Sequence, residues 1–107
     1  MGAAEERLAR NEAFFREVND RIEDVARGFG GDDRYEFLCE CVDLGCVERI
    51  ALTLAEYEAV RANGRRFVVA RDHAIADIEV VVERDRDHEV VQKVGVGGEV
   101  ADELDPR

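Results

Sequence analysis

The sequence predicts one α+β domain, in which a long N-terminal helix packs on a small, mostly antiparallel sheet beside one shorter helix. Three observations lead to this fold. Apolar residues recur every seven positions over residues 4–29, β-branched runs alternate with turn residues over 34–94, and all three cysteines lie within eight residues. At 107 residues the chain has the size of a single domain with a small core.

Residues 4–29 are predicted to form the long helix. Their apolar side chains follow an a/d heptad seam, with Leu8, Phe15, Ile22 and Phe29 at a and Asn11, Val18 and Val25 at d. Such a stripe has to be covered. We expect it to dock on the protein's own sheet, because three heptads are short for a coiled coil and Phe is bulky at a. The alternative is a homodimer through this helix, with Asn11 helping to fix the register.

Residues 34–94 form the predicted core. A strand over 35–39 and a second over 47–52 make a hairpin whose tip is the cysteine stretch. Thr53 and Glu56 have the spacing of a capping box, which starts a helix over 53–63 that ends at Asn63-Gly64.

A strand over 67–70, a polar connection and a hairpin over 78–94 complete this core. The first arm of that hairpin also fits helical spacing, but three consecutive valines favour a strand. Glycines and acids over 95–107 predict a flexible acidic tail with at most one helical turn at 100–104.

The stretch CECVDLGC, residues 39–46, holds every cysteine of the chain in C-x-C-x4-C spacing. Crowded thiols are paired, metal-bound or reactive, and zinc sites commonly take two ligands from one tight turn. A structural zinc has four protein ligands. His73 lies in a loop after a strand and is better placed for the fourth position than His88, which we expect at the surface. The predicted Zn²⁺ site is therefore Cys39, Cys41, Cys46 and His73, which makes the hairpin tip a zinc knuckle.

Other interpretations of the cysteines stay open. The fourth ligand could instead be an acid, water or a residue of another chain. The three thiols could form a redox sensor. Cys39 and Cys41 share one face of a strand and could simply pack in the core. An iron–sulfur cluster would need a fourth cysteine, which the chain lacks.

The C39-E-C41-V-D-L-G-C46 stretch resembles the zinc knuckle of post-SET segments of histone methyltransferases, where a distant residue supplies the fourth ligand. The resemblance covers eight residues and implies no methyltransferase activity. Over most of its length, through FFREVNDRIED, CECVDLGC, LTLAEYEAVR and RRFVVARDH, the chain looks like small uncharacterised actinobacterial proteins. That resemblance implies that the knuckle and His73 belong together.

The net charge of −11 bears on the choice of partners. Nucleic acid and anionic membranes are disfavoured, and Arg61, Arg65 and Arg66 are the main basic group. A protein partner with basic patches fits better, although acidity also simply keeps a protein soluble. The odd cysteine count and the lack of a targeting segment favour a reducing cytoplasm.

Catalysis is the less favoured function. A site of three thiolates and a histidine leaves no open position on the metal. The glycines at 95–98 lack the pattern of a phosphate-binding loop, and no G-x-S-x-G or H-E-x-x-H motif occurs. The sequence thus predicts a zinc-stabilised interaction or regulatory protein.

Overall fold

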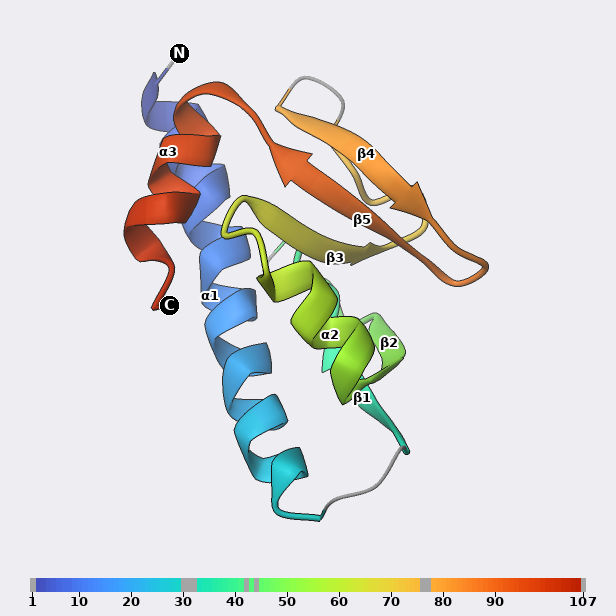
Figure 1. Ribbon diagram of the computed structural model, residues 1–107. Helices are drawn as coiled ribbons and strands as arrows, with labels where there is room; N and C mark the ends of the chain where they lie inside the picture. Colours follow the sequence, from blue (N-terminus) through green and yellow to red (C-terminus); the bar gives the residue numbers. More distant parts are fainter. Residues whose placement is uncertain (1, 30–32, 42, 44, 76–77, 107) are drawn as a thin grey trace.

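A computed structural model describes residues 2–29, 33–41, 43, 45–75 and 78–106 of the chain. Its elements follow one another from blue to red in Figure 1: α1 (Gly2–Arg27), β1 (Arg34–Leu38), β2 (Arg49–Thr53), α2 (Leu54–Arg61), β3 (Arg66–Ala70), β4 (Glu79–Arg84), β5 (His88–Lys93) and α3 (Gly95–Leu104). The predicted α+β fold with its long N-terminal helix is confirmed. Both expected hairpins and the helix after Thr53 are present.

The strands form two antiparallel sheets, where the sequence led us to expect one. β1 pairs with β2, and β5 lies between β3 and β4 in the second sheet. The sheets meet just after β1, where the backbone N–H of Glu40 donates to the carbonyl of Val68 in β3 at 2.8 Å. Apolar side chains of both sheets and α2 fill the core between them, chiefly Phe37, Ile50, Leu52, Tyr57, Phe67, Val69 and Val91.

The start of α2 is fixed by the predicted capping box. The backbone N–H of Glu56 donates to Thr53 Oγ1 at 3.1 Å, and the N–H of Thr53 donates to Glu56 Oε1 at 2.8 Å. Two of the backbone donors that a helix start leaves without partners are satisfied in this way. Tyr57, one turn further on, is then held in the core with its ring stacked on Phe37 at 4.5 Å between centroids.

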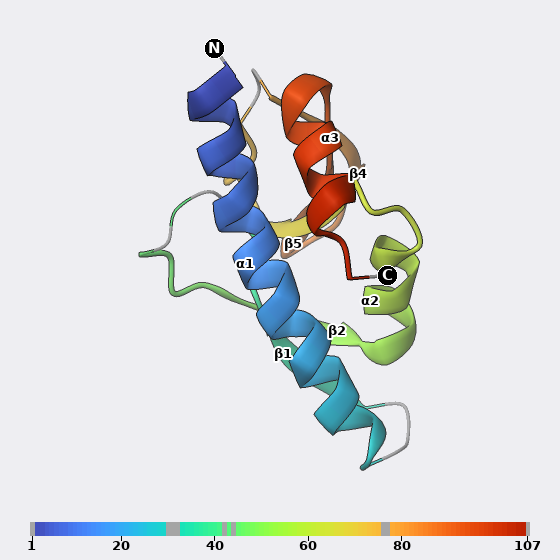
Figure 2. The same cartoon turned by 90° about the vertical axis from the view of Figure 1, so that its left-hand side faces the viewer.

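The helix α1 runs along the body of the molecule and is seen in front of it in Figure 2. It packs with a different face from the one expected. The buried residues of α1 include four polar ones, Glu12, Arg16, Asn19 and Glu23, interspersed with alanines. Of the heptad seam, Phe15 is buried and Ile22 partly so, but Val25 and Phe29 are 66% and 76% exposed. The helix packs on the protein's own strands as expected, but mainly through a neighbouring face that ion pairs and hydrogen bonds hold. The expectation is wrong for Val25 and Phe29, which stay outside the contact.

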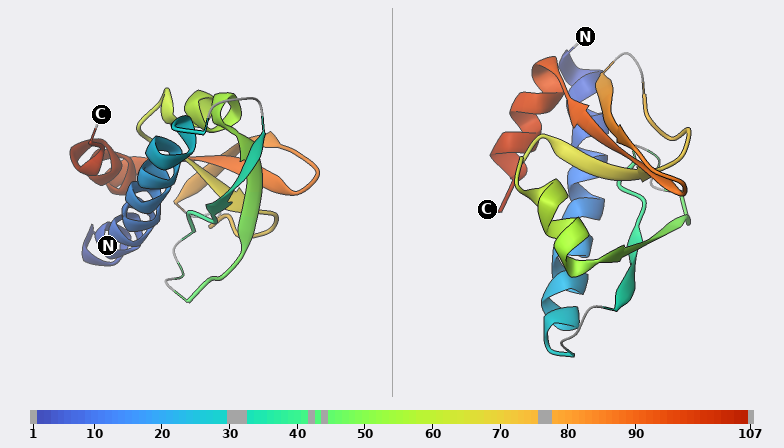
Figure 3. Two further views of the ribbon diagram at one scale, coloured as in Figure 1. Left: turned by 90° about the horizontal axis from the view of Figure 1, so that it is seen from below. Right: turned by 45° about the vertical axis from the view of Figure 1, so that its right-hand side comes forward.

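Residues 95–104 form the helix α3, so the prediction of a flexible tail is wrong here. α3 lies alongside α1, and a view from below shows it on one side of α1 with the strands on the other (Figure 3). Val100 and Ala101 are buried. The absence of a side chain at Gly98 lets α3 lie close to Arg65 and Lys93. A Cβ atom at this position would lie 2.8 Å from Arg65 Nη1 and 3.1 Å from the carbonyl oxygen of Lys93. The glycines that we associated with a loop are thus contact points of a helix.

Charged side chains bridge α1 to the rest of the molecule. The guanidinium of Arg16 donates to the carbonyl of Ala101 at 2.9 Å and lies 4.6 Å from the ring centroid of Phe67. Nearer the N-terminus of α1, Glu12 contacts the ammonium group of Lys93 in β5. Glu79 of β4 pairs with the same ammonium group at 3.3 Å. The interior of this protein is therefore partly ionic. No helix among the described residues is long and apolar enough to cross a membrane.

Candidate metal centre

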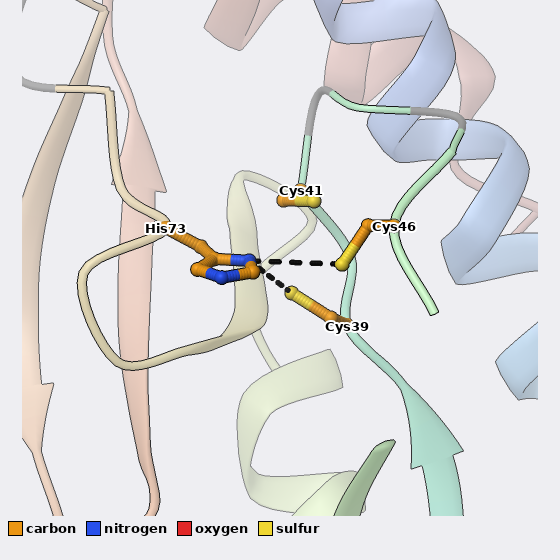
Figure 4. A group of neighbouring side chains, drawn as sticks. All are labelled: Cys39, Cys41, Cys46 and His73. Atoms are coloured by element: carbon orange, nitrogen blue, oxygen red, sulfur yellow. Dashed lines mark hydrogen bonds between the residues drawn. The ribbon is translucent and has the colours of Figure 1, made fainter. Parts of the chain in front are cut away.

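Two separate loops bring the four predicted ligands together. Cys39 and Cys41 follow β1, Cys46 precedes β2, and His73 lies in the turn after β3. Figure 4 shows the imidazole of His73 reaching across from its loop toward the three sulfur atoms of the knuckle. The structure thus places all four predicted residues in one site, although 34 positions separate Cys39 from His73.

The distances within this site suit a tetrahedral metal. One potential ligand atom from each of Cys39, Cys41, Cys46 and His73 lies within 4.8 Å of every other. His73 Nδ1 is 3.4 Å from the sulfur of Cys39 and 3.7 Å from that of Cys46. A tetrahedral zinc with ordinary bond lengths would hold a nitrogen and a sulfur about 3.6 Å apart. In the part of the chain that the structure describes, this is the one group of metal-binding side chains so closely set.

The knuckle is shaped by short polar contacts around Asp43. Its side-chain oxygen Oδ1 accepts from the backbone N–H of Gly45 at 2.8 Å, and its carbonyl accepts from that of Cys46 at 3.0 Å. These two bonds make a turn that carries Cys46 back toward Cys41. The turn follows from the local sequence, because Asp side chains readily bond the backbone two residues on.

A second tight turn directs His73. Its backbone N–H donates to the carbonyl of Ala70 at 3.1 Å, and Asp72 adopts a left-handed conformation with φ of 68°. Asp tolerates that region better than most residues. The chain therefore reverses immediately after β3, and the imidazole faces the hairpin tip.

The sulfur of Cys39 also has a backbone donor. The N–H of Ala70, at the end of β3, lies 3.1 Å from Cys39 Sγ. A hydrogen bond to a thiolate favours its charged form, and outer contacts of this kind orient metal ligands. The same bond ties the knuckle to β3 independently of His73.

Electrostatics also favour a cation at this position. Cys39 and Cys41 are almost fully buried, and burial raises the pKa of both thiols. Neighbouring thiols raise the pKa of Cys39 further, since several thiolates in one pocket repel one another. The positive charge of a divalent ion offsets this repulsion, and a thiol that coordinates such an ion is deprotonated outright.

Glu40, between two of the cysteines, belongs to a different set of contacts. Its carboxylate accepts from Asn19 Nδ2 at 2.9 Å, from the hydroxyl of Tyr57 at 3.2 Å and from the backbone N–H of Val68 at 3.0 Å. Burial raises its pKa to about 7, while the bonds from Asn19 and Val68 lower it. The sulfurs line the site, while the Glu40 carboxylate accepts hydrogen bonds from α1, α2 and β3 behind it.

The sequence indicated that Glu40 would turn away from the cysteines, but it did not identify Asn19 or Tyr57 as its partners. Asn19 lies on the helical face that carries the alanines. A polar residue among alanines was the signal in the sequence that could have identified it as buried and hydrogen-bonded. His88 starts β5 and lies outside the cysteine group, in an open polar pocket beside Arg34 and Glu56.

Comparison of the chain with protein-family models, with curated proteins and with solved structures gives no match. The four-residue site and the fold around it are therefore the basis for function.

Proposed function

We propose that the protein binds one zinc ion through Cys39, Cys41, Cys46 and His73, and that this ion has a structural role. The observation that carries the proposal is the convergence of the four ligand atoms within 4.8 Å from two loops. The C-x-C-x4-C spacing that resembles the post-SET knuckle, with its distant fourth ligand, supports the same assignment.

Zinc fits this set of donors better than other common ions. Three sulfurs and an imidazole are soft to intermediate ligands, which exclude magnesium and calcium and suit zinc. Three thiolates and a neutral histidine around Zn²⁺ carry a net charge of about −1, which is ordinary for structural sites. With four protein ligands there is no open position for a substrate, so we assign the ion no catalytic step.

In this proposal the metal joins the β1–β2 hairpin to the loop after β3. A chain of this length builds only a small core, and a metal that binds the folded state alone adds its binding free energy to folding. We place the protein in a reducing cytoplasm, where free thiols persist, and propose that it serves as a regulatory or interaction module for a protein partner with basic patches. The net charge of −11 supports that choice of partner.

A redox role for the thiols has less support. Burial of Cys39 and Cys41 raises their pKa, so these two thiols carry little reactive thiolate at neutral pH when no metal is bound. Rapid oxidation of the metal-loaded protein by peroxide, coupled to zinc release, would favour that role over the structural one.

The test is the metal content of protein purified without added metal, measured by native mass spectrometry. We expect one zinc per chain in the parent and in His88→Ala, a control that removes the other histidine. His73→Ala should weaken zinc binding by more than about a hundredfold, because it removes a direct ligand. Cobalt substitution reports the geometry: tetrahedral d–d bands with sulfur-to-cobalt charge transfer are expected in the parent.

Three outcomes would count against parts of the proposal. A metal-free parent whose three thiols react freely would overturn the metal site. Iron in place of zinc would overturn the identity of the metal. Undiminished zinc affinity in His73→Ala would overturn the assignment of the fourth ligand.

A further inference from the structure

Asn19 of α1 binds the chain on both sides of Cys39. Its Nδ2 donates to the carbonyl of Leu38 and to Glu40 Oε2, both at 2.9 Å, and its Oδ1 accepts from the backbone N–H of Leu38 at 2.8 Å. Leu38 and Glu40 directly precede and follow Cys39. Asn19 itself is fully buried. One side chain of α1 therefore holds the segment that carries the first two predicted ligands.

Backbone bonds from both sheets fix the same segment. The N–H of Cys39 donates to the carbonyl of Glu48 at 3.2 Å, and the N–H of Glu40 donates to the carbonyl of Val68 at 2.8 Å. Together with the bonds of Asn19, they involve no sulfur atom and no imidazole. The path of the chain through Cys39 is thus fixed by groups other than the metal ligands.

The bonds of Asn19 require an amide. An amide side chain offers two N–H donors and an acceptor oxygen, and all three take part here. A carboxylate at this position would set an oxygen against the carbonyl of Leu38 and the carboxylate of Glu40. Alanine would leave these buried groups without their partner, which is costly.

We propose that Asn19 is a positioning residue for the metal centre and couples metal binding to the packing of α1. The inference rests on the proposed zinc site and adds a means of regulating it. Groups that are ordered before binding lose less conformational entropy when they bind. Hydrogen bonds behind metal ligands commonly change metal affinity by roughly ten- to a hundredfold. Cys39 and Cys41 flank Glu40, so both thiols lose their positions when this segment loosens.

The coupling acts in both directions. Zinc binds more tightly to the state in which α1 is packed, because Asn19 holds the knuckle only in that state. By thermodynamic linkage, bound zinc stabilises the packing of α1 by the same factor. Zinc therefore controls the order of a helix that supplies none of the four ligands.

The test measures zinc affinity by competition with a chromophoric chelator, where circular dichroism shows the metal-free chains folded. Asn19→Ala should weaken zinc binding roughly ten- to a hundredfold, and Asn19→Asp at least as much. The d–d bands of bound cobalt should also shift in Asn19→Ala, because displaced sulfurs distort the tetrahedron. Glu40→Gln in the Asn19→Asp background supplies an N–H donor to the new carboxylate and should restore part of the affinity.

The matched control is Thr53→Ala, which removes the capping side chain of α2 and lowers stability without touching Leu38 or Glu40. This variant should keep the zinc affinity and the cobalt spectrum of the parent. The comparison separates a loss of positioning from a general loss of stability.

Hydrogen exchange of the parent tests the coupling without any substitution. Removal of zinc should speed exchange of the Leu38 amide and of the α1 amides around Asn19 more than that of the β4–β5 hairpin. An even rise throughout the chain would overturn the coupling to α1.

Two results in the variants would overturn the positioning role while leaving the zinc site intact. One is a parent that binds one zinc ion and an Asn19→Ala variant of equal affinity and identical cobalt spectrum. The other is equal weakening in Thr53→Ala, which would show that affinity follows stability alone. A parent that binds no metal would overturn the proposed function and this inference together.

Discussion

Glu12 provides a direct test of how this protein holds α1 in place. Its carboxyl group is fully buried against Lys93 of β5, and Glu79 of β4 pairs with the same ammonium group. Two carboxyl groups thus share one cation. The cluster is neutral if one carboxyl keeps a proton, and burial together with the neighbouring Glu79 raises the pKa of Glu12 to about 10. The perturbation we choose is Glu12→Gln, which keeps the shape and supplies a neutral group without a proton to lose.

The size of the effect follows from proton linkage. An unfolded chain loses the Glu12 proton near pH 4.3, whereas the folded chain keeps it to about pH 10. Between these limits the folded state binds one more proton, so the free energy of unfolding falls as pH rises, by about 1.4 kcal/mol per pH unit. From pH 6 to pH 8 the parent should therefore lose roughly 3 kcal/mol more stability than Glu12→Gln, in which this proton is absent.

Urea denaturation followed by circular dichroism at pH 6, 7 and 8 would measure this difference. The matched control is Glu17→Gln, an exposed carboxylate on the same helix, which should keep the pH slope of the parent. Other titrating groups, the metal ligands included, cancel when the parent and the variants are compared. Parallel stability curves for the parent and Glu12→Gln would refute the reasoning, because they would show that Glu12 is ionised in the folded protein.

Two further predictions concern packing around the site and α3. Tyr57→Phe removes a buried hydroxyl whose acceptors are Asp20 Oδ1 at 3.0 Å and Glu40 Oε2 at 3.2 Å. We expect a loss of about 1–2 kcal/mol in urea denaturation with one metal still bound per chain. Unchanged stability would mean that neither hydrogen bond stabilises the folded protein. Gly98→Ala places a methyl group 3.1 Å from the carbonyl oxygen of Lys93, which has to shift to make room. We expect this strain to exceed the roughly 1 kcal/mol that alanine gains over glycine in a helix, so that thermal unfolding shows a net loss of about 1 kcal/mol. A variant as stable as the parent would contradict the close approach of α3 to β5.

Much of the fold was predictable because its signals are local. The capping box of Thr53 and Glu56, the valine-rich hairpin and the cysteine spacing each depend on residues close in sequence. The choice of His73 over His88 as the fourth ligand was predictable for a simpler reason, since the chain offers only two histidines and one of them lies in a loop after a strand. The sequence could not show that the fourth ligand lies within reach, which depends on the pairing of the two sheets.

The errors arose where distant residues decide the outcome. Hydrophobic periodicity placed the seam of α1 inward, yet the buried face carries Glu12, Arg16 and Asn19. Each of these polar groups is buried because a partner far along the chain compensates it, such as Lys93 or the carbonyl of Ala101. Similarly, the glycines of α3 argue against a helix by propensity, and packing on α1 overrides that preference.

The outer edge of β3 shows what the knuckle does for the solubility of the protein. Each outward backbone N–H of this strand already has an acceptor: the carbonyl of Asn63 for Arg66, the Glu40 carboxylate for Val68 and the Cys39 sulfur for Ala70. An edge strand with open donors is a template on which other chains add strands and aggregate. The cysteine stretch therefore covers this edge at Val68 and Ala70. A chain that lost its knuckle would expose these two backbone N–H groups, to which a strand of another chain can pair.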